Sequence, residues 1–175
     1  MAITYDTSGN LNVYSAGPNT ATVIVASASH RYMLFNADAE ITAISYAGVS
    51  ATLLQTLTPT ASGGASPAPV IKVWGLADPA TGSNTLSITG TTSSVNYGVI
   101  YAVYSGVDAT QPEANNVAFN AASPGNQYFS TLSTSISTLT STAWVVSMYR
   151  TNNQSGGDIS SATNATLRYN YGNSA

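Results

Sequence analysis

Short segments in which apolar residues alternate with small polar ones constrain the fold of this chain more than any other feature. Side chains of a β-strand point alternately to its two faces, so a period of two predicts strands, and we find no stripe typical of an amphipathic helix. Residues that favour turns, mostly Gly, Pro, Asn and Asp, separate the segments. About ten short strands at regular spacing predict an all-β fold, which we expect to be an antiparallel two-sheet β-sandwich resembling a jelly roll.

One of these segments stands out because both of its faces are apolar. Tyr97–Tyr104 is therefore predicted to be a central strand that is covered on both sides. Ala47–Val49 and Asp78–Gly82 have the composition of tight turns, and Thr58–Pro69 and Gly106–Gly125 that of long loops. The remaining strands are expected over Thr20–Ser27, Arg31–Ala37, Ile41–Tyr46, Ala51–Leu57, Val70–Leu76, Thr85–Thr89, Gln127–Thr138, Ala143–Arg150 and Ala165–Tyr171.

The length of 175 residues fits one domain that buries a sizeable core without a metal or a disulfide. We expect residues 1–18 to form an N-terminal arm or first strand and residues 19–175 to form a single β-sandwich domain. The sequence has no cysteine, which excludes disulfides and thiolate metal sites. It also has no apolar run of the roughly 18 residues that a membrane helix needs, so no membrane partner is expected.

Charge is scarce in this sequence. Charged residues make up 6% of it, against about 25% in typical soluble domains, and Ser, Thr, Asn and Gly take their place. The basic residues Arg31, Lys72, Arg150 and Arg168 are scattered, which argues against binding of nucleic acid. A net charge of -3 gives little mutual repulsion, so we expect partner subunits to cover part of the surface.

The search for catalytic groups yields little. His30 is the only histidine, no Gly-x-Ser-x-Gly motif accompanies it, and we expect it to lie exposed in a turn. Asp38 and Glu40 would share a face on a strand, as acid–base pairs and Ca²⁺ ligands do, but a solvated loop before Ile41 is the preferred interpretation. Asp108 is expected to stabilise a turn. These observations predict a protein that is not an enzyme and has no cofactor or metal.

Aromatic residues are the better candidates for recognition, because an exposed ring stacks on a sugar while neighbouring amides bind its hydroxyls. We nevertheless prefer Trp74, Trp144 and most tyrosines as core or subunit-interface residues. The candidate recognition or interface residues are Tyr128, Tyr149, Asn152, Asn153, Tyr169 and Tyr171.

Three stretches carry a resemblance to a known module: Ile41–Val49, Val73–Leu86 and Tyr104–Pro112. In order and spacing they resemble a β-sandwich module that recurs in structural proteins of tailed phages and in bacterial surface proteins. The resemblance spans roughly residues 20–150. Members of that group usually continue with another strand after the region matching Arg150–Tyr171. If that strand is missing here, the sheet has an open edge or a partner subunit supplies the strand.

The resemblance and the composition together lead to one expectation and one alternative. The first six residues lack the basic and apolar regions of a signal peptide, whereas the composition is typical of proteins that work outside cells. A protein made in the host cytoplasm and released in virions by lysis satisfies both. We therefore expect a homo-oligomeric virion component, such as a capsid decoration or head-fibre protein, with capsid or fibre subunits as partners. Met1–Pro18 would be a docking arm whose removal leaves the fold intact.

The alternative is a receptor- or carbohydrate-binding module of a tail fibre or cell-surface protein, with a host glycan as its partner. Such a protein would be extracellular or attached to the cell surface. It would use the exposed tyrosines and the loop Thr58–Pro69 for recognition.

Overall fold

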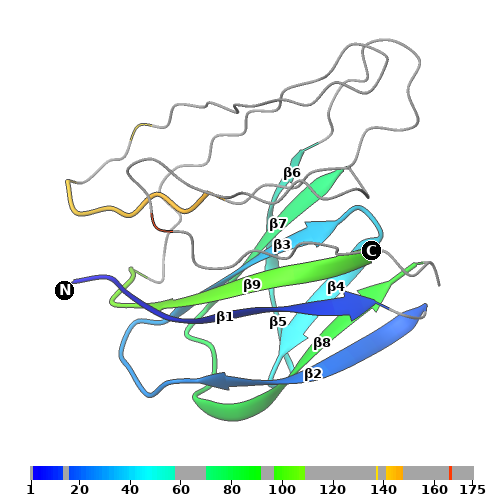
Figure 1. Cartoon of the computed structure of the whole chain (residues 1–175), viewed down its shortest axis with the longest axis horizontal. Coiled ribbons are helices and arrows are strands. Elements are labelled where there is room, and N and C mark those ends of the chain that lie inside the picture. The colour runs from blue at the N-terminus through cyan, green and yellow to red at the C-terminus, as the bar shows by residue number, and fades with distance from the viewer. Residues whose placement is uncertain are drawn as a thin grey trace.

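The structure is a computed structural model that describes residues 2–13, 16–57, 70–91, 97–108, 137, 141–147 and 166. Within these residues the chain forms nine β-strands and no helix (Figure 1). The strands make two antiparallel sheets that pack face to face, which confirms the predicted β-sandwich.

The larger sheet has five strands in the order β1-β9-β3-β7-β6. Their bounds are Thr4–Val13 for β1, Tyr97–Ser105 for β9, Tyr32–Asp38 for β3, Ile71–Ala77 for β7 and Thr52–Leu57 for β6. The smaller sheet has the order β2-β8-β4-β5, with bounds Gly17–Val25, Gly82–Gly90, Ile41–Tyr46 and Val49–Ser50. The chain changes sheet at every connection except the hairpins β4–β5 and β6–β7.

The core lies between the two sheets and follows the alternation of the sequence. On β8, Leu86 and Ile88 are fully buried, while Thr85, between them and the turn, is exposed. β8 thus presents its apolar side chains inward at every second position. The core consists of Val13, Val23, Val25, Met33, Phe35, Ala37, Ile41, Ile44, Tyr46, Ala51, Trp74, Leu76, Leu86, Ile88, Val99 and Val103.

Strand β9 is covered on both faces, as its two apolar faces predict. Val99 and Val103 point into the core and are fully buried. Ala102 and Tyr104 lie on the opposite face, and each is only 7% exposed. Part of this second cover is a segment of the same chain, because the ring of Trp144 packs edge-on against Tyr104.

The tight turn predicted at Ala47 is a two-residue hairpin loop. Ala47 and Gly48 have φ values of 51° and 80°, and Tyr46 pairs with Val49 across the hairpin. Two successive residues with positive φ match the right-handed twist of the flanking strands, and glycine adopts this conformation without steric cost. Val49 therefore belongs to β5 rather than to the turn.

The first residues of the chain are part of the larger sheet. Thr4–Val13 pairs with β9 along its length, with one irregularity between Tyr5 and Thr7, and β2 begins at Gly17. Of the two forms expected for residues 1–18, the structure has the strand and not a free arm. Because β1 pairs with β9, we expect removal of this segment to disrupt the fold, contrary to the interpretation as a docking arm.

Several expected elements lie outside the described residues. These are the loop Thr58–Pro69, most of Gly106–Gly125, and nearly all of the strands expected over Gln127–Thr138 and Ala165–Tyr171. Residues 143–147 are described and are not in a strand, so the strand expected over Ala143–Arg150 is wrong for that portion.

Candidate functional site

Charged side chains of the described part bind backbone groups of neighbouring segments. The ammonium group of Lys72 on β7 donates to the carbonyl oxygens of Ala39 and Ile41, at 2.6 and 2.8 Å. The carboxylate of Asp6 on β1 accepts a hydrogen bond of 2.8 Å from the backbone N–H of Ala26, just after β2. Each contact joins strands of different sheets through a connecting loop.

Arg31 and Asp78 fix the end of the sandwich where β2 leads into β3. The guanidinium Nε of Arg31 donates to the carbonyl of Pro79 at 2.8 Å, and Nη1 donates to the carbonyl of Ala28. The carboxylate of Asp78 accepts the backbone N–H of Arg31 at 3.2 Å. These charges orient loops, and hydrogen bonds to charged groups stabilise more than neutral ones.

The position of Asp38 differs from the solvated loop that the sequence predicted. Its side chain is only 3% exposed, at the end of β3, and accepts the backbone N–H of Gly98 on β9 at 2.9 Å. It therefore does not lie in a solvated loop. Glu40 follows in the turn, where its backbone carbonyl accepts the N–H of Thr91 at 3.1 Å. Within the described residues no group of three or more His, Asp or Glu side chains is placed to hold a metal ion.

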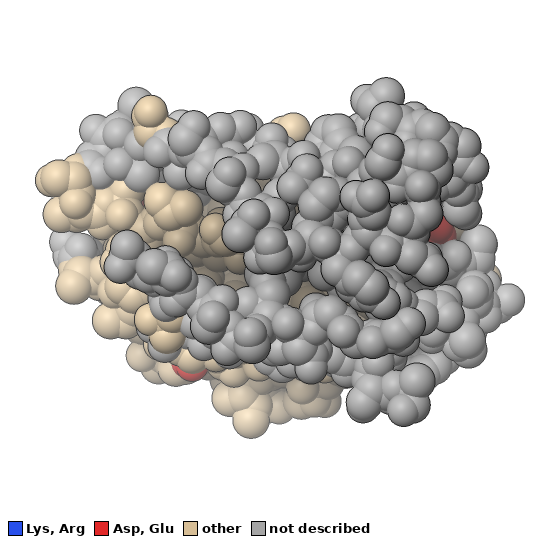
Figure 2. Space-filling view, turned by 45° about the horizontal axis from the view of Figure 1, so that its top comes forward, with Lys and Arg blue, Asp and Glu red and all other residues tan. Residues whose placement is uncertain are grey.

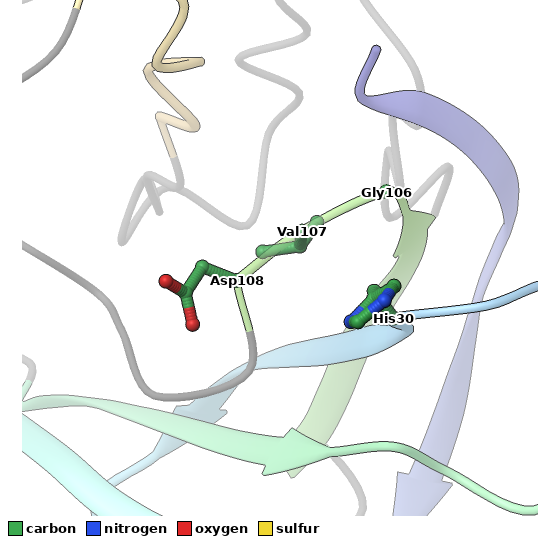
Figure 3. Close-up of a pocket in the computed structure, with 4 residues that line it drawn as sticks. All are labelled: His30, Gly106, Val107 and Asp108. Carbon is green, nitrogen blue, oxygen red and sulfur yellow. The ribbon is translucent and has the colours of Figure 1, made fainter. Parts of the chain in front are cut away.

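His30 and Asp108 line an open pocket of about 320 Å³ at the end of β9 (Figure 3). His30 is exposed, as predicted, with a φ of 53°, and its carbonyl accepts the N–H of Val107 at 2.9 Å. Gly106 and Val107 complete the lining. The carboxylate of Asp108 points away from the imidazole of His30 (Figure 3), so the two groups do not form an acid–base pair.

Three aromatic rings form a row beside the pocket-bearing end of β9. Tyr5 meets Tyr104 edge to face at 6.2 Å between ring centroids, and Tyr104 meets Trp144 in the same way at 6.3 Å. Trp74 is in the core at 8% exposed, whereas Trp144 is 46% exposed, which excludes a core position for Trp144 and leaves the subunit-interface position as a prediction. Tyr5, at the other end of the row from Trp144, shares a hydrogen bond of 2.8 Å with the hydroxyl group of Ser8.

The recognition residues predicted from the sequence stay a prediction. Tyr128, Tyr149, Asn152, Asn153, Tyr169 and Tyr171 all lie outside the described residues. The aromatic row was not predicted, because its members are separated by up to 139 positions, from Tyr5 to Trp144, and nothing local in the sequence joins them.

The smaller sheet carries no charged residue on any of its four strands. On its outer face Thr20 pairs with Ser87 and Thr22 pairs with Thr85, so hydroxyl groups form rows across the sheet. The exposed apolar side chain of this face is Ile24 on the edge strand β2, at 67% exposed. The outer face of the smaller sheet therefore presents hydroxyl groups and the exposed aliphatic side chain of Ile24.

Charge is also scarce among the described residues on the face drawn in Figure 2. In the view of Figure 2 the described atoms belong almost entirely to uncharged residues, with small acidic spots among them. Proteins are usually kept apart in solution by surface charge, so a surface of this kind is suited to contact with other molecules.

Comparison with known proteins gives no match, either to a family model, to a characterised protein or to a solved structure. Among the described residues, no helix has the length and apolarity that crossing a membrane requires.

Proposed function

We propose that this protein is a non-enzymatic structural component of a virus particle, such as a capsid decoration, head-fibre or other accessory protein. The observation that carries the proposal is the smaller sheet, whose four strands contain no charged residue and whose outer face is exposed. A face of this kind gains from being covered by a partner and has no ionic groups to desolvate on contact.

The way in which the charged side chains are used supports the same proposal. Asp6, Arg31, Lys72 and Asp78 each bind backbone groups of loops. The loops are thereby tied to the rigid sandwich, and little charge is left on the surface to repel a neighbouring subunit. A stiff body with an uncharged face is what a passive component of a shell requires.

Co-sedimentation tests the proposal. Lysate of the source would be separated on a density gradient, the particle fractions washed, and the protein quantified by mass spectrometry. We expect co-migration with capsids in a fixed ratio to the major capsid subunit. Recovery in the soluble or cell-wall fractions alone would overturn the proposal.

The aromatic row favours a second candidate function, a carbohydrate-binding module. Trp144 is 46% exposed and packs edge-on against the buried ring of Tyr104, a contact that restricts its orientation. An exposed indole packed against a second ring suits the apolar face of a sugar ring. The ligand would be a host surface glycan.

A glycan array would test this second function with the wild-type protein and two variants. Trp144→Ala removes the exposed ring and should abolish glycan binding, whereas Val145→Ala changes a neighbouring side chain that is 56% exposed and should leave it intact. Absence of binding by the wild-type protein, or equal binding by Trp144→Ala, would rule out the aromatic row as a sugar site.

A further inference from the structure

The two sheets have four edge strands within the described residues, and they differ in how they are protected. β1 and β6 border the larger sheet, and β2 and β5 border the smaller one. An edge strand exposes unpaired backbone N–H and C=O groups, and proteins usually guard such edges with bulges, charges, prolines or short strands.

Three of the four edges carry such a device. β1 has a register irregularity between Tyr5 and Thr7, with the charged residue Asp6 at that point. β6 has an irregularity between Leu53 and Gln55. β5 is only two residues long, Val49–Ser50. Each device interrupts the regular edge that another strand would need for pairing.

β2 is the exception. It has nine residues and pairs with β8 in a continuous register from Gly17 to Val25 without a bulge. It contains no charged residue, and its single proline, Pro18, lies at the beginning of the strand. The side chain of Ile24 is 67% exposed near its end. In Figure 1, β2 runs along the lower border of the molecule.

We propose that β2 is a self-association edge, at which a second copy of this chain pairs its own β2 antiparallel and joins the two smaller sheets into one. A second copy is the fitting partner because antiparallel pairing of identical strands follows from a two-fold axis. Like charges opposite each other destabilise a strand pair, and a strand without charge meets none when it pairs with itself. The inference does not depend on the proposed function, because it concerns the isolated protein.

A pair of matched lysine variants tests the proposal. Thr20→Lys/Thr22→Lys places two positive charges on the edge strand of each copy. Four lysines would then lie at the interface between the two β2 strands of the dimer. Thr85→Lys/Ser87→Lys places the same charges on the partners of those residues across the β2–β8 ladder. The strand spacing of about 4.8 Å puts the β8 lysines of two copies about 14 Å apart, beyond the Debye length of about 8 Å at physiological salt.

The readout is the dimer dissociation constant from sedimentation equilibrium. We expect a concentration-dependent dimer for the wild-type protein, a rise in the constant of about tenfold or more for Thr20→Lys/Thr22→Lys, and little change for the β8 variant. A monomeric wild-type protein at about 100 μM, where even weak pairing would be populated, would overturn the proposal. An edge variant that dimerises like the wild type would also overturn it.

Cysteine crosslinking provides a second readout that needs no disruptive charge. The chain has no cysteine, so single substitutions report one position at a time. We expect oxidation to link copies covalently when cysteines replace Thr20, Thr22 or Ile24, alone or in mixed pairs, because strand pairing brings such positions within disulfide range. Thr85→Cys is the control and should not crosslink. Crosslinking at Thr85 as fast as at all the β2 positions would contradict the proposal.

Discussion

Asp38 connects two strands whose bonded residues are 60 positions apart in the sequence. Its carboxylate is 3% exposed and accepts the N–H of Gly98 at 2.9 Å. A buried N–H that loses its acceptor costs free energy because it has already been removed from water. The pairing of β3 with β9 thus includes a side-chain contact at its end.

Replacement of Asp38 should therefore destabilise the protein to a degree that depends on the substituent. We expect Asp38→Ala to lower the free energy of unfolding by about 1–3 kcal/mol, and Asp38→Asn to lower it less because the amide keeps an acceptor oxygen for Gly98. Urea denaturation would measure both. An Asp38→Ala variant as stable as the wild type would show that the contact with Gly98 contributes nothing.

Tyr32 makes stability sensitive to alkaline pH. Its side chain is 7% exposed, and burial raises the pKa of its phenol above the ordinary value of 10.0. In the unfolded chain the phenol ionises near that value while the folded protein keeps it protonated, so the free energy of unfolding falls as pH rises above it. Tyr32→Phe should show a shallower fall between about pH 9 and about pH 11. Equal slopes for variant and wild type would contradict this account.

For single residues, the sequence predicted the exposure of His30 and the burial of Trp74, since each follows from the local pattern. It did not predict the burial of Asp38 or the aromatic row from Tyr5 to Trp144. Both depend on contacts between residues far apart in the chain, which no local periodicity contains.

Strands with strong alternation or apolar content were predicted within a few residues. Tyr97–Tyr104 corresponds to β9, and Ile41–Tyr46 corresponds to β4. The sequence does not decide whether the first residues form an arm or a strand, because Thr4–Val13 is mostly polar. Pairing with β9, and not its own composition, makes it a strand.

Deletion of residues 2–13 should consequently prevent folding. It would uncover β9 and remove Val13, a core residue that is 1% exposed. We expect the truncated chain to lose the cooperative thermal transition by circular dichroism, and addition of a peptide of residues 2–13 to restore it in part. A truncated chain that melts cooperatively at the wild-type temperature would show that β1 is dispensable.

In the whole molecule, the position of the charged residues bears more on how a partner could attach than their number does. The charged residues of the described part lie in the larger sheet and in the loops, as with Lys72 and Arg31, while the smaller sheet has none. Composition predicted a surface poor in charge, but only the pairing of the strands shows that four uncharged strands form one sheet. Attachment through that sheet would involve hydrogen bonds and apolar contact, which salt screens little.

Attachment to a particle through the smaller sheet is tested by the amount of this protein bound per particle after density-gradient sedimentation at low and at high salt. We predict a fixed ratio to the capsid subunit that stays the same from about 0.1 M to about 1 M sodium chloride, although the Debye length falls from about 10 Å to about 3 Å over that range. Release by salt would contradict attachment through the uncharged sheet. Absence from the particle fractions at both concentrations would contradict the virion role itself.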